Sequence, residues 1–505
     1  MHKNKDMKSY ITKAFPLLLL LLTASCSDFL QEEDKDKVIP RTVEQYEAMM
    51  HQEAFLSVNW FYRSDFMTDD IEENALASTT AKNAYKSLYS WQRDVERDGS
   101  GTPTAATNCM WANLYSEILT ANYVIEQSSD AEGTESEREN IMGEAYFLRA
   151  RAYLELVNIY APVYDAATAG STPGIPIRLG TGVKNDYPRN TLREVYRLIE
   201  NDLNASIAHF ERSNENLSLW HPNKRAALLL LSRVYLYEGQ WEKVIETTSR
   251  LIELCPQGLY DLKLHPGQSF VTKTNPEILH TYGSCAVLIV ETDGMGGRLF
   301  DVPNVYRSDV TVTYGISSEA RSMYHEGDLR PALWFVASTS GKDVPAKWHS
   351  QFTQIGAYNY RLSEAYLSRA EAYAALDQAT EAEADLRTVL KARVQDISSV
   401  TLPTSADELR RFAVDERRRE FLGENHRWYD LRRTQSWYPK LITHVFTLRS
   451  SGSGSSAGVQ QGKERYFLSS DSPNYTFEVP EGELEINGAV TPYDKRQEPA
   501  VIVDK

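Results

Sequence analysis

Cysteine is scarce in this chain, and its few thiols follow no pairing pattern. Four cysteines occur among 505 residues, at Cys26, Cys109, Cys255 and Cys285. Such scattered positions exclude a disulfide framework and a C-x-x-C metal site. Catalytic motifs are missing as well, because neither an H-E-x-x-H zinc helix nor a Walker loop occurs. A G-x-S-x-G spelling at 454–458 lies in a run of serine and glycine, without the strand and helix that a catalytic serine turn requires.

Basic residues are also fewer than acidic ones. The chain carries 54 lysines and arginines against 70 acidic residues, a formal net charge of −16. An acidic surface repels phosphate backbones and anionic lipid headgroups, so we expect no nucleic-acid partner and no polybasic membrane contact. A link to a membrane must therefore come from a lipid.

The amino terminus has the layout that attaches such a lipid. Lysines precede an apolar run at 14–22, small residues fill 23–25, and Cys26 follows. The run is too short to span the ~30 Å hydrocarbon core of a bilayer, so 1–25 is predicted to be a removed signal peptide. The segment resembles the lipobox of bacterial lipoproteins, which implies a lipid on Cys26 and an acidic, lipid-anchored tether at 26–40. Ordinary secretion with a free thiol is the alternative.

An internal repeat indicates the fold. The run 145–153 is echoed by 365–373, and a copy that includes the turn covers 228–256. Apolar residues recur at intervals of three and four, which places one apolar stripe on each helix. The pattern resembles the tetratricopeptide repeat, a pair of helices that buries its stripes by stacking on neighbouring pairs. We therefore predict a mainly α fold of about four helix pairs, over about 111–256 and 359–433.

Between these two helical stretches the helical period disappears. Residues 257–358 contain short strand-like runs and a glycine cluster, which predicts an irregular excursion on the ligand-binding side of a rigid frame. Residues 450–458 have the composition of a flexible linker, and 450–505 is expected to be an extended tail. One domain is predicted over 41–505.

A cluster of carboxylates begins at Asp65. Asp65, Asp69 and Asp70 could bind calcium through their oxygens, or two of the cluster could act as the acid and nucleophile of a glycosidase. A helix start or a solvated loop would use the same residues, and we favour that structural interpretation. We expect no cofactor, while a structural calcium ion stays an open question.

The most specific motif lies at 415–433. It reads D-E-R-R-R-E-F-L-G-E-N-H-R-W-Y-D-L-R-R, and its arginines could fork onto its carboxylates in a buried, structural ion network. The predicted members are Arg417, Arg418, Arg427 and Arg432 with Glu416, Glu420, Glu424 and Asp430. The motif resembles the SusD/RagB family, whose members share an E-R-R-x-E helix followed by R-(W/F)-x-D-L-R-R.

This resemblance implies a function. Members of the family are surface lipoproteins of the outer membrane that bind nutrients, commonly glycans, and cover a SusC-like TonB-dependent transporter. They are not enzymes. We therefore expect this protein to face the cell exterior, bind glycans and deliver them to such a transporter. Capture of peptides or another non-sugar nutrient is the alternative, and a glycosidase is a more remote one.

Candidate ligand-binding residues are aromatic rings in loops. Sugar sites combine flat rings, on which the C–H faces of the sugar stack, with a few polar partners. The resemblance places one part of the site before the first repeat helix and another in the irregular excursion. The candidates are Tyr89 and Trp91, Trp334 and Trp348, and a third pair, Trp60 and Tyr62. A place in the core is the alternative for each ring.

Overall fold

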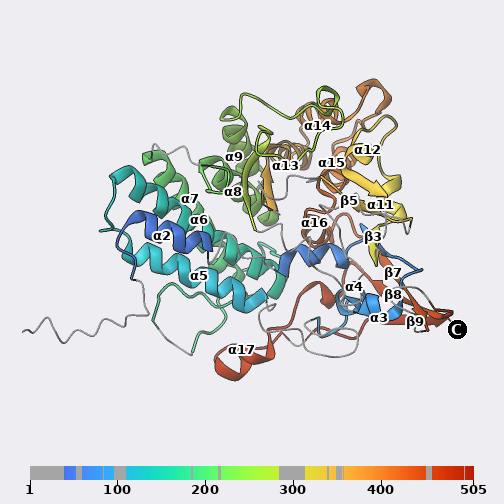
Figure 1. Ribbon diagram of the computed structural model, residues 1–505, viewed down its shortest axis with the longest axis horizontal. Coiled ribbons are helices and arrows are strands. Elements are labelled where there is room, and N and C mark those ends of the chain that lie inside the picture. The colour runs from blue at the N-terminus through green and yellow to red at the C-terminus, as the bar shows by residue number, and fades with distance from the viewer. Residues whose placement is uncertain are drawn as a thin grey trace, which may run out of the picture. The chain divides into compact units, whose positions relative to one another are not determined.

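The body of the protein begins at Thr42 and is built around packed helices (Figure 1). The computed structural model describes 39–52, 60–83, 85–95, 110–182, 186–213, 218–283, 313–337, 341–347, 355–356, 358–450, 458–493 and 495–504, without the side chains of 60–63 and 81. The predicted signal peptide and Cys26 lie outside the described residues.

Eight long helices of the described chain form the frame. They are α5 (Met110–Gln127), α6 (Glu135–Tyr160), α7 (Leu192–Arg212), α8 (Lys224–Glu238), α9 (Trp241–Glu253), α13 (Leu362–Ala375), α14 (Ala379–Arg393) and α15 (Ala406–Phe421). Each of α5 to α8 packs on the next, α9 packs on α8 and α13, and α13 packs on α14 and α15. The predicted mainly α, repeat-like frame is confirmed.

The core runs through the middle of this stack. Leu228, Leu229, Leu230 and Leu231 point to different sides of α8, and all four are buried. A helix that is apolar all round must be covered all round. Helices α7, α9 and α13 provide that cover.

Local sequence signals set where several helices start and stop. Ser405 and Glu408 have the spacing of a capping box, and the Ser405 hydroxyl accepts a hydrogen bond from the backbone N–H of Glu408 at the start of α15. Thr134 and Thr191 form full capping boxes at α6 and α7. Gly239 ends α8 with a left-handed φ of 71°, which makes the sharp turn into α9.

Shorter helices lie around the frame. They are α2 (Val43–Met50), η3 (Trp60–Met67), α3 (Thr79–Asn83), α4 (Lys86–Tyr89), η5 (Leu262–Leu264), α11 (Ser318–Ser322), α12 (Arg330–Trp334), η7 (Ile397–Ser399), α16 (Arg427–Thr434), η8 (Pro473–Tyr475) and α17 (Glu481–Ile486). Of these, α2 packs on α5 and α6, as Figure 1 shows, so it extends the helical stack at its first pair.

Small antiparallel sheets connect distant parts of the chain. The pairs are β1 (Ile71–Glu73) with β3 (Tyr314–Ile316), β2 (Ile278–Tyr282) with β6 (Tyr358–Arg361), and β4 (Phe335–Ala337) with β5 (Asp343–Pro345). A three-stranded sheet has the order β7 (Ile442–Arg449), β8 (Gln460–Leu468) and β9 (Ala500–Asp504). Strands β8 and β9 belong to the predicted tail, and their pairing in this sheet satisfies backbone groups that an isolated extended segment would leave open.

The buried ion network exists, but several of its partners differ from the predicted ones. Arg417 does meet Asp430, at 3.3 Å. Glu420 instead binds three arginines from outside the motif, Arg330, Arg361 and Arg393, at 2.7 to 3.1 Å. All of these side chains are buried. Spacing along one segment could not reveal partners that lie on α12, β6 and α14.

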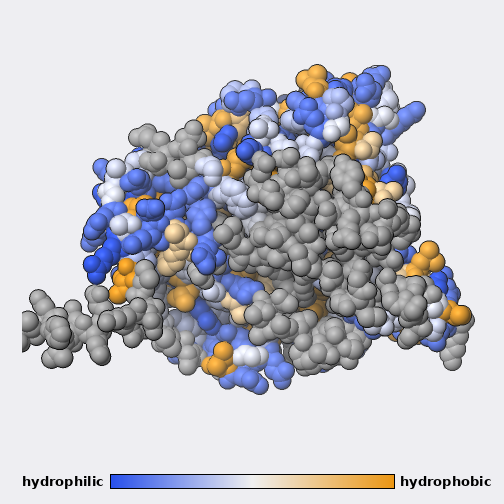
Figure 2. All heavy atoms as spheres, viewed as in Figure 1, coloured by the Kyte–Doolittle hydropathy of each residue, from blue (hydrophilic) through white to orange (hydrophobic). Residues whose placement is uncertain are grey.

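The described part of the face in Figure 2 is mostly polar. In Figure 2 the outer faces of α2 and α7 are largely hydrophilic, and hydrophobic residues lie in small separate groups. Among the described residues, no helix has the length and apolar character needed to cross a bilayer.

Removing the Glu420 carboxylate should destabilise the fold strongly. Glu420→Ala leaves three buried guanidinium groups without their shared partner, so we expect the free energy of unfolding to fall by about 3–5 kcal/mol. Urea denaturation measures the loss. Glu383→Ala is the control, since it removes a half-exposed pair with Arg387 and should cost about 0.5 kcal/mol at most. Equal effects of the two changes would contradict the central role of Glu420.

Candidate functional site

The structure corrects the first predicted pair of ligand-binding rings. Tyr89 and Trp91 are buried, at 1% and 0% exposure. Both rings stack on the imidazole of His444, with centroid distances of 4.1 and 4.3 Å. The Trp91 indole also donates a hydrogen bond to the carbonyl oxygen of Met67 at 2.9 Å. These rings belong to the core, because their faces and polar groups are already engaged.

Trp334 is likewise a core residue. Its side chain is fully buried and packs on Phe270 at a centroid distance of 4.7 Å. The ammonium group of Lys347 lies 4.4 Å from the Trp334 ring centroid and donates to Glu424 at 2.6 Å. Burial lowers the pKa of Lys347 to about 8, and Glu424 opposes this shift. Trp334 thus covers the ion network instead of facing a ligand.

The remaining predicted rings cannot be placed. Trp348 and the side chains of Trp60 and Tyr62 lie outside the described residues. Their role in ligand binding stays a prediction.

Arginines surround the carboxylates that were considered for calcium. Asp69 binds Arg427 at 2.8 Å and Arg418 at 3.1 Å, and Arg418 also meets Asp70 at 2.5 Å. Burial alone would raise the pKa of Asp69, but Arg427 and Arg418 hold it well below its usual range. The remaining candidate, Asp65, accepts a hydrogen bond from the backbone N–H of Asn425 at 3.4 Å. Guanidinium groups therefore already offset the charge of Asp69 and Asp70.

A polar, tyrosine-rich pocket lies between α6, α8, α16 and the pair β2 and β6. Its lining includes Tyr237, Tyr282, Tyr358, Tyr360 and Tyr429. About 50 Å³ inside it is open to the centres of water-sized molecules. Pockets that enclose a whole small molecule measure about 300–1,000 Å³. This pocket therefore suits the end of a ligand rather than an entire oligosaccharide.

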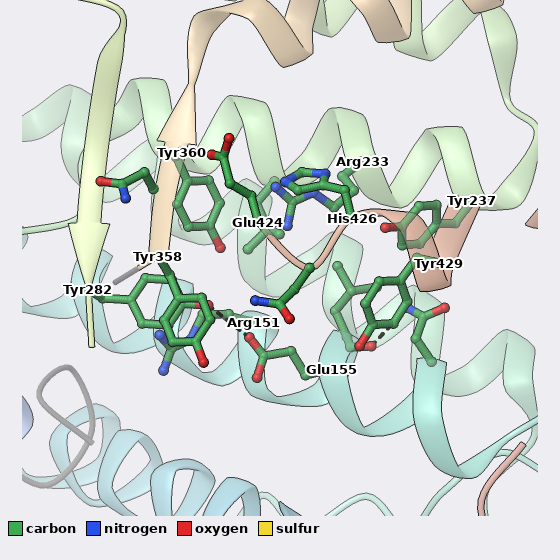
Figure 3. Close-up of a pocket in the computed structure, with 15 residues that line it drawn as sticks. Arg151, Glu155, Arg233, Tyr237, Tyr282, Tyr358, Tyr360, Glu424, His426 and Tyr429 are labelled. Atoms are coloured by element: carbon green, nitrogen blue, oxygen red, sulfur yellow. Dashed lines mark hydrogen bonds between the residues drawn. The ribbon is translucent and has the colours of Figure 1, made fainter. Parts of the chain in front are cut away.

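The tyrosines form pairs at two ends of the pocket, as Figure 3 shows. At one end Tyr282 and Tyr358 stack with their ring centroids 4.8 Å apart. At the other end Tyr237 and Tyr429 lie nearly parallel at 6.3 Å. Hydroxyl groups and ring edges thus border the space from both sides.

Arg151 and Glu155 of α6 set the electrostatics between these pairs. The Arg151 guanidinium lies 4.1 Å from the Tyr282 ring centroid and binds Glu117 at 2.7 Å. The Tyr282 hydroxyl donates a hydrogen bond to Glu155 at 3.2 Å. Burial raises the pKa of Glu155 to about 7, although the positive charge of Arg151 opposes the rise. Glu155 can therefore accept or donate hydrogen bonds near neutral pH.

A tight turn between α15 and α16 provides the opposite wall. Gly423 and Asn425 have left-handed φ angles of 78° and 62°, the conformation that glycine and asparagine adopt most readily. The turn directs Glu424, Asn425 and His426 to the pocket. Glu424 is paired with Arg361 at 2.8 Å. Burial holds the pKa of His426 well below its usual range, so its imidazole is neutral.

Asn359 is a lining residue with an unsatisfied polar atom. Its side-chain oxygen is buried and has no hydrogen-bond partner among the described residues. Its amide nitrogen donates to the carbonyl oxygen of Gly356 at 3.3 Å, which fixes the orientation of the side chain. A ligand hydroxyl that reached this oxygen would supply its missing hydrogen bond.

The loop tryptophans predicted from the sequence do not line this site where the structure describes their side chains. Tyr358 and Tyr360 alternate at the start of the predicted helical stretch 359–433, which is a strand signal, and both line the pocket. Tyr282 lies on the paired strand β2. Only the pairing of β2 with β6 brings these rings together.

Two family models match the chain. One, described as "Starch-binding associating with outer membrane", matches residues 28–236. The other, described as "SusD family", matches residues 330–493. Both matches contain pocket residues, since Arg151 and Glu155 lie in the first and Tyr358 in the second.

Similar sequences and structures carry the same family name. The SusD-like protein P2 of Formosa agariphila is 23% identical over 68% of this chain and 74% of its own length. A SusD-like carbohydrate binding protein from Bacteroides vulgatus has a TM-score of 0.68 at 20% identity, over 90% of this chain and 98% of its own. A SusD superfamily protein from Bacteroides thetaiotaomicron has a TM-score of 0.67 at 19% identity, over 89% and 99%. At such identities the structural likeness shows the fold.

The burial of Trp91 can be tested by its effect on stability. Trp91→Ala should lower the free energy of unfolding by about 3–5 kcal/mol, because it leaves a cavity beside His444. Trp220→Ala, at a partly exposed tryptophan, should cost clearly less. Urea denaturation compares the two variants, and a Trp91→Ala protein as stable as the parent would place this ring at the surface.

The raised pKa of Glu155 predicts a pH dependence of stability. Between pH 4.5 and 7 the unfolded chain loses this proton while the folded chain keeps it, so the contribution of Glu155 to stability falls as the pH rises. Glu155→Gln should remove this loss. Urea denaturation of both proteins should show the variant gaining stability on the parent between pH 4.5 and 7.5, by about 3 kcal/mol at most. A constant difference across this range would contradict the assignment.

Proposed function

This chain belongs to the SusD/RagB family, and we propose that it captures glycans at the outer surface of the outer membrane and delivers them unchanged to a TonB-dependent transporter. The observation that carries the glycan part is the pocket, whose lining combines the stacked Tyr282 and Tyr358 rings with Asn359, a residue whose side-chain oxygen has no hydrogen-bond partner among the described residues. Aromatic edges beside hydrogen-bonding groups match the mixed apolar and polar surface of a sugar.

The size of the pocket favours one mode of capture. Its inner space accepts a ligand end, so one sugar ring would enter while the remainder of the glycan stays outside. Asn359 would accept a hydrogen bond from a sugar hydroxyl, and Glu155 would hydrogen-bond to another. This arrangement selects by hydroxyl position rather than by chain length.

The carboxylates of the pocket support binding without catalysis. Glycoside hydrolysis requires a proton-donating carboxyl group and a second, free carboxylate across the bond that is cleaved. Glu155 could donate a proton at neutral pH. The second pocket carboxylate, Glu424, is held by Lys347 and Arg361 at 2.6 and 2.8 Å. A paired carboxylate is a poor nucleophile, so we propose that the ligand leaves intact.

Membrane attachment and the transporter partner rest on the sequence and the family. The leader with Cys26 predicts a lipid anchor, and one family model is described as associating with the outer membrane. A lipid would keep the acidic protein at a membrane whose headgroups its charge does not attract. A SusC-like transporter is the partner that the family resemblance implies.

Glycan binding is tested by isothermal titration calorimetry with panels of oligosaccharides and peptides. We expect an oligosaccharide to bind and Asn359→Ala to weaken it about tenfold, since one hydrogen bond contributes about 1–1.5 kcal/mol. Tyr358→Ala should weaken it by a similar factor. Tyr164→Ala is the control, because this partly buried tyrosine packs against the tilted ring of Tyr196 and does not line the pocket.

The outcomes separate the site from the function. If an oligosaccharide binds and neither Asn359→Ala nor Tyr358→Ala weakens the binding, the site lies elsewhere on the protein. The proposed function is kept in that case. If only peptides bind, the ligand is the alternative nutrient and not a glycan. Release of shorter sugars from a bound oligosaccharide would contradict delivery of an intact ligand.

A further inference from the structure

A cluster of histidine and glutamate side chains lies where α2 packs on α6. Glu47 and His51 are four residues apart on α2 and at its carboxyl end, so both project from one face. His221, from the loop before α8, meets them there. His51 Nε2 lies 3.3 Å from His221 Nδ1, and Glu47 Oε1 lies 3.2 Å from His221 Nε2.

These three residues are close enough to share one metal ion. Each offers one ligand atom, and the three atoms lie within 4.8 Å of one another. In a tetrahedral zinc site with bonds of about 2.0–2.1 Å, neighbouring ligand atoms lie about 3.3 Å apart. The three side chains therefore need only small rotations to surround an ion.

A fourth residue holds His221 from behind. Glu144 of α6 is fully buried, and its Oε1 lies 3.0 Å from His221 Nδ1. Asn140 donates to the same oxygen at 2.7 Å, while the other oxygen, Oε2, has no partner among the described residues. A carboxylate on one imidazole nitrogen is the usual outer support of a metal-bound histidine, because it fixes the ring and leaves the other nitrogen for the metal.

The loop that carries His221 is fixed in place. The carbonyl oxygen of Leu219 accepts a hydrogen bond from the backbone N–H of Thr281 at 2.8 Å and lies 2.9 Å from His280 Nδ1. Asn223 donates to the carbonyl oxygen of Leu279 at 2.9 Å. Strand β2 thus holds both sides of His221, and a rigid loop lowers the cost of ordering a ligand set.

We propose that Glu47, His51 and His221 bind a divalent transition-metal ion such as Zn²⁺, with Glu144 orienting His221. Two imidazoles and a carboxylate suit zinc, whereas calcium prefers six to eight oxygens. His221 also lines a cavity of about 380 Å³. This cavity provides an entry path for the ion and leaves room for a water ligand.

The ion would act as a clip between parts of the chain that are distant in sequence. It joins α2 to the loop before α8, and through Glu144 it reaches α6. A ligand that binds only the folded state stabilises it in proportion to the logarithm of its concentration. The inference does not depend on glycan binding, since neither α2 nor Glu144 contributes to the tyrosine pocket.

A competing arrangement uses the same residues without a metal. A protonated His221 could bridge Glu47 and Glu144 as an ordinary buried ion pair. Such a pair would bind no zinc, and His51 would add little to it. Metal uptake that requires both histidines therefore separates the two arrangements.

The experiment measures Zn²⁺ binding to the EDTA-treated protein by isothermal titration calorimetry and by thermal unfolding. We expect one Zn²⁺ per chain, a higher melting temperature with Zn²⁺, and at least tenfold weaker binding in His51→Ala and in His221→Ala. His209→Ala is the matched control, because His209 pairs with Glu139 at 2.7 Å and belongs to no three-residue metal cluster among the described residues. This variant should keep full Zn²⁺ affinity.

A conservative variant distinguishes the loss of a metal ligand from misfolding. Glu47→Gln changes a partly exposed side chain, keeps its size and should also weaken Zn²⁺ binding while the protein remains folded. Cobalt can replace zinc, and its visible absorption should change in the two histidine variants. The proposal is overturned if the parent takes up no stoichiometric Zn²⁺, if Glu47→Gln and both histidine variants bind like the parent, or if excess Ca²⁺ displaces the ion.

Discussion

The buried carboxylate of Glu420 connects more of this fold than any other side chain described above. It lies on α15 and binds Arg330 of α12, Arg361 of β6 and Arg393 of α14. Burial alone would raise the pKa of Glu420, but Arg393 and Arg361 hold it well below its usual range, so the carboxylate stays charged. In a low-dielectric interior such charges are tolerated only when every partner is in place. The network therefore fixes the end of α15 relative to three other elements.

The same ion network fixes the geometry of the pocket. Arg361 ends strand β6, which carries Tyr358 and Tyr360, and it also binds Glu424 in the turn after α15. The turn can be this tight because Gly423 adopts a left-handed φ. Two walls of the pocket are thus joined through one guanidinium group. A site that must recognise hydroxyl positions benefits from such rigidity, since little conformational entropy is lost when the ligand binds.

Helix α6 relates the pocket to the histidine cluster. Glu144, Arg151 and Glu155 are separated by seven and four residues, so they lie along one face of the helix. All three are buried, and each uses its charge differently: Glu144 supports His221, Arg151 lies against Tyr282, and Glu155 accepts a hydrogen bond from Tyr282. One face of α6 therefore contributes charged residues to both polar sites, the tyrosine pocket and the histidine cluster.

Features that depend on local sequence could be predicted, and features that depend on distant partners could not. The helical repeat, the start of α15 at Ser405 and the burial of most of the 415–433 arginines follow from spacing and side-chain chemistry within short windows. Tertiary structure alone decided that Arg418 meets Asp70, 348 residues away, and that Trp91 stacks on His444. It also paired β2 with β6 to form the tyrosine pocket. The physical reason is that periodicity fixes which side of an element is buried, whereas the neighbour on that side is chosen only when the whole chain packs.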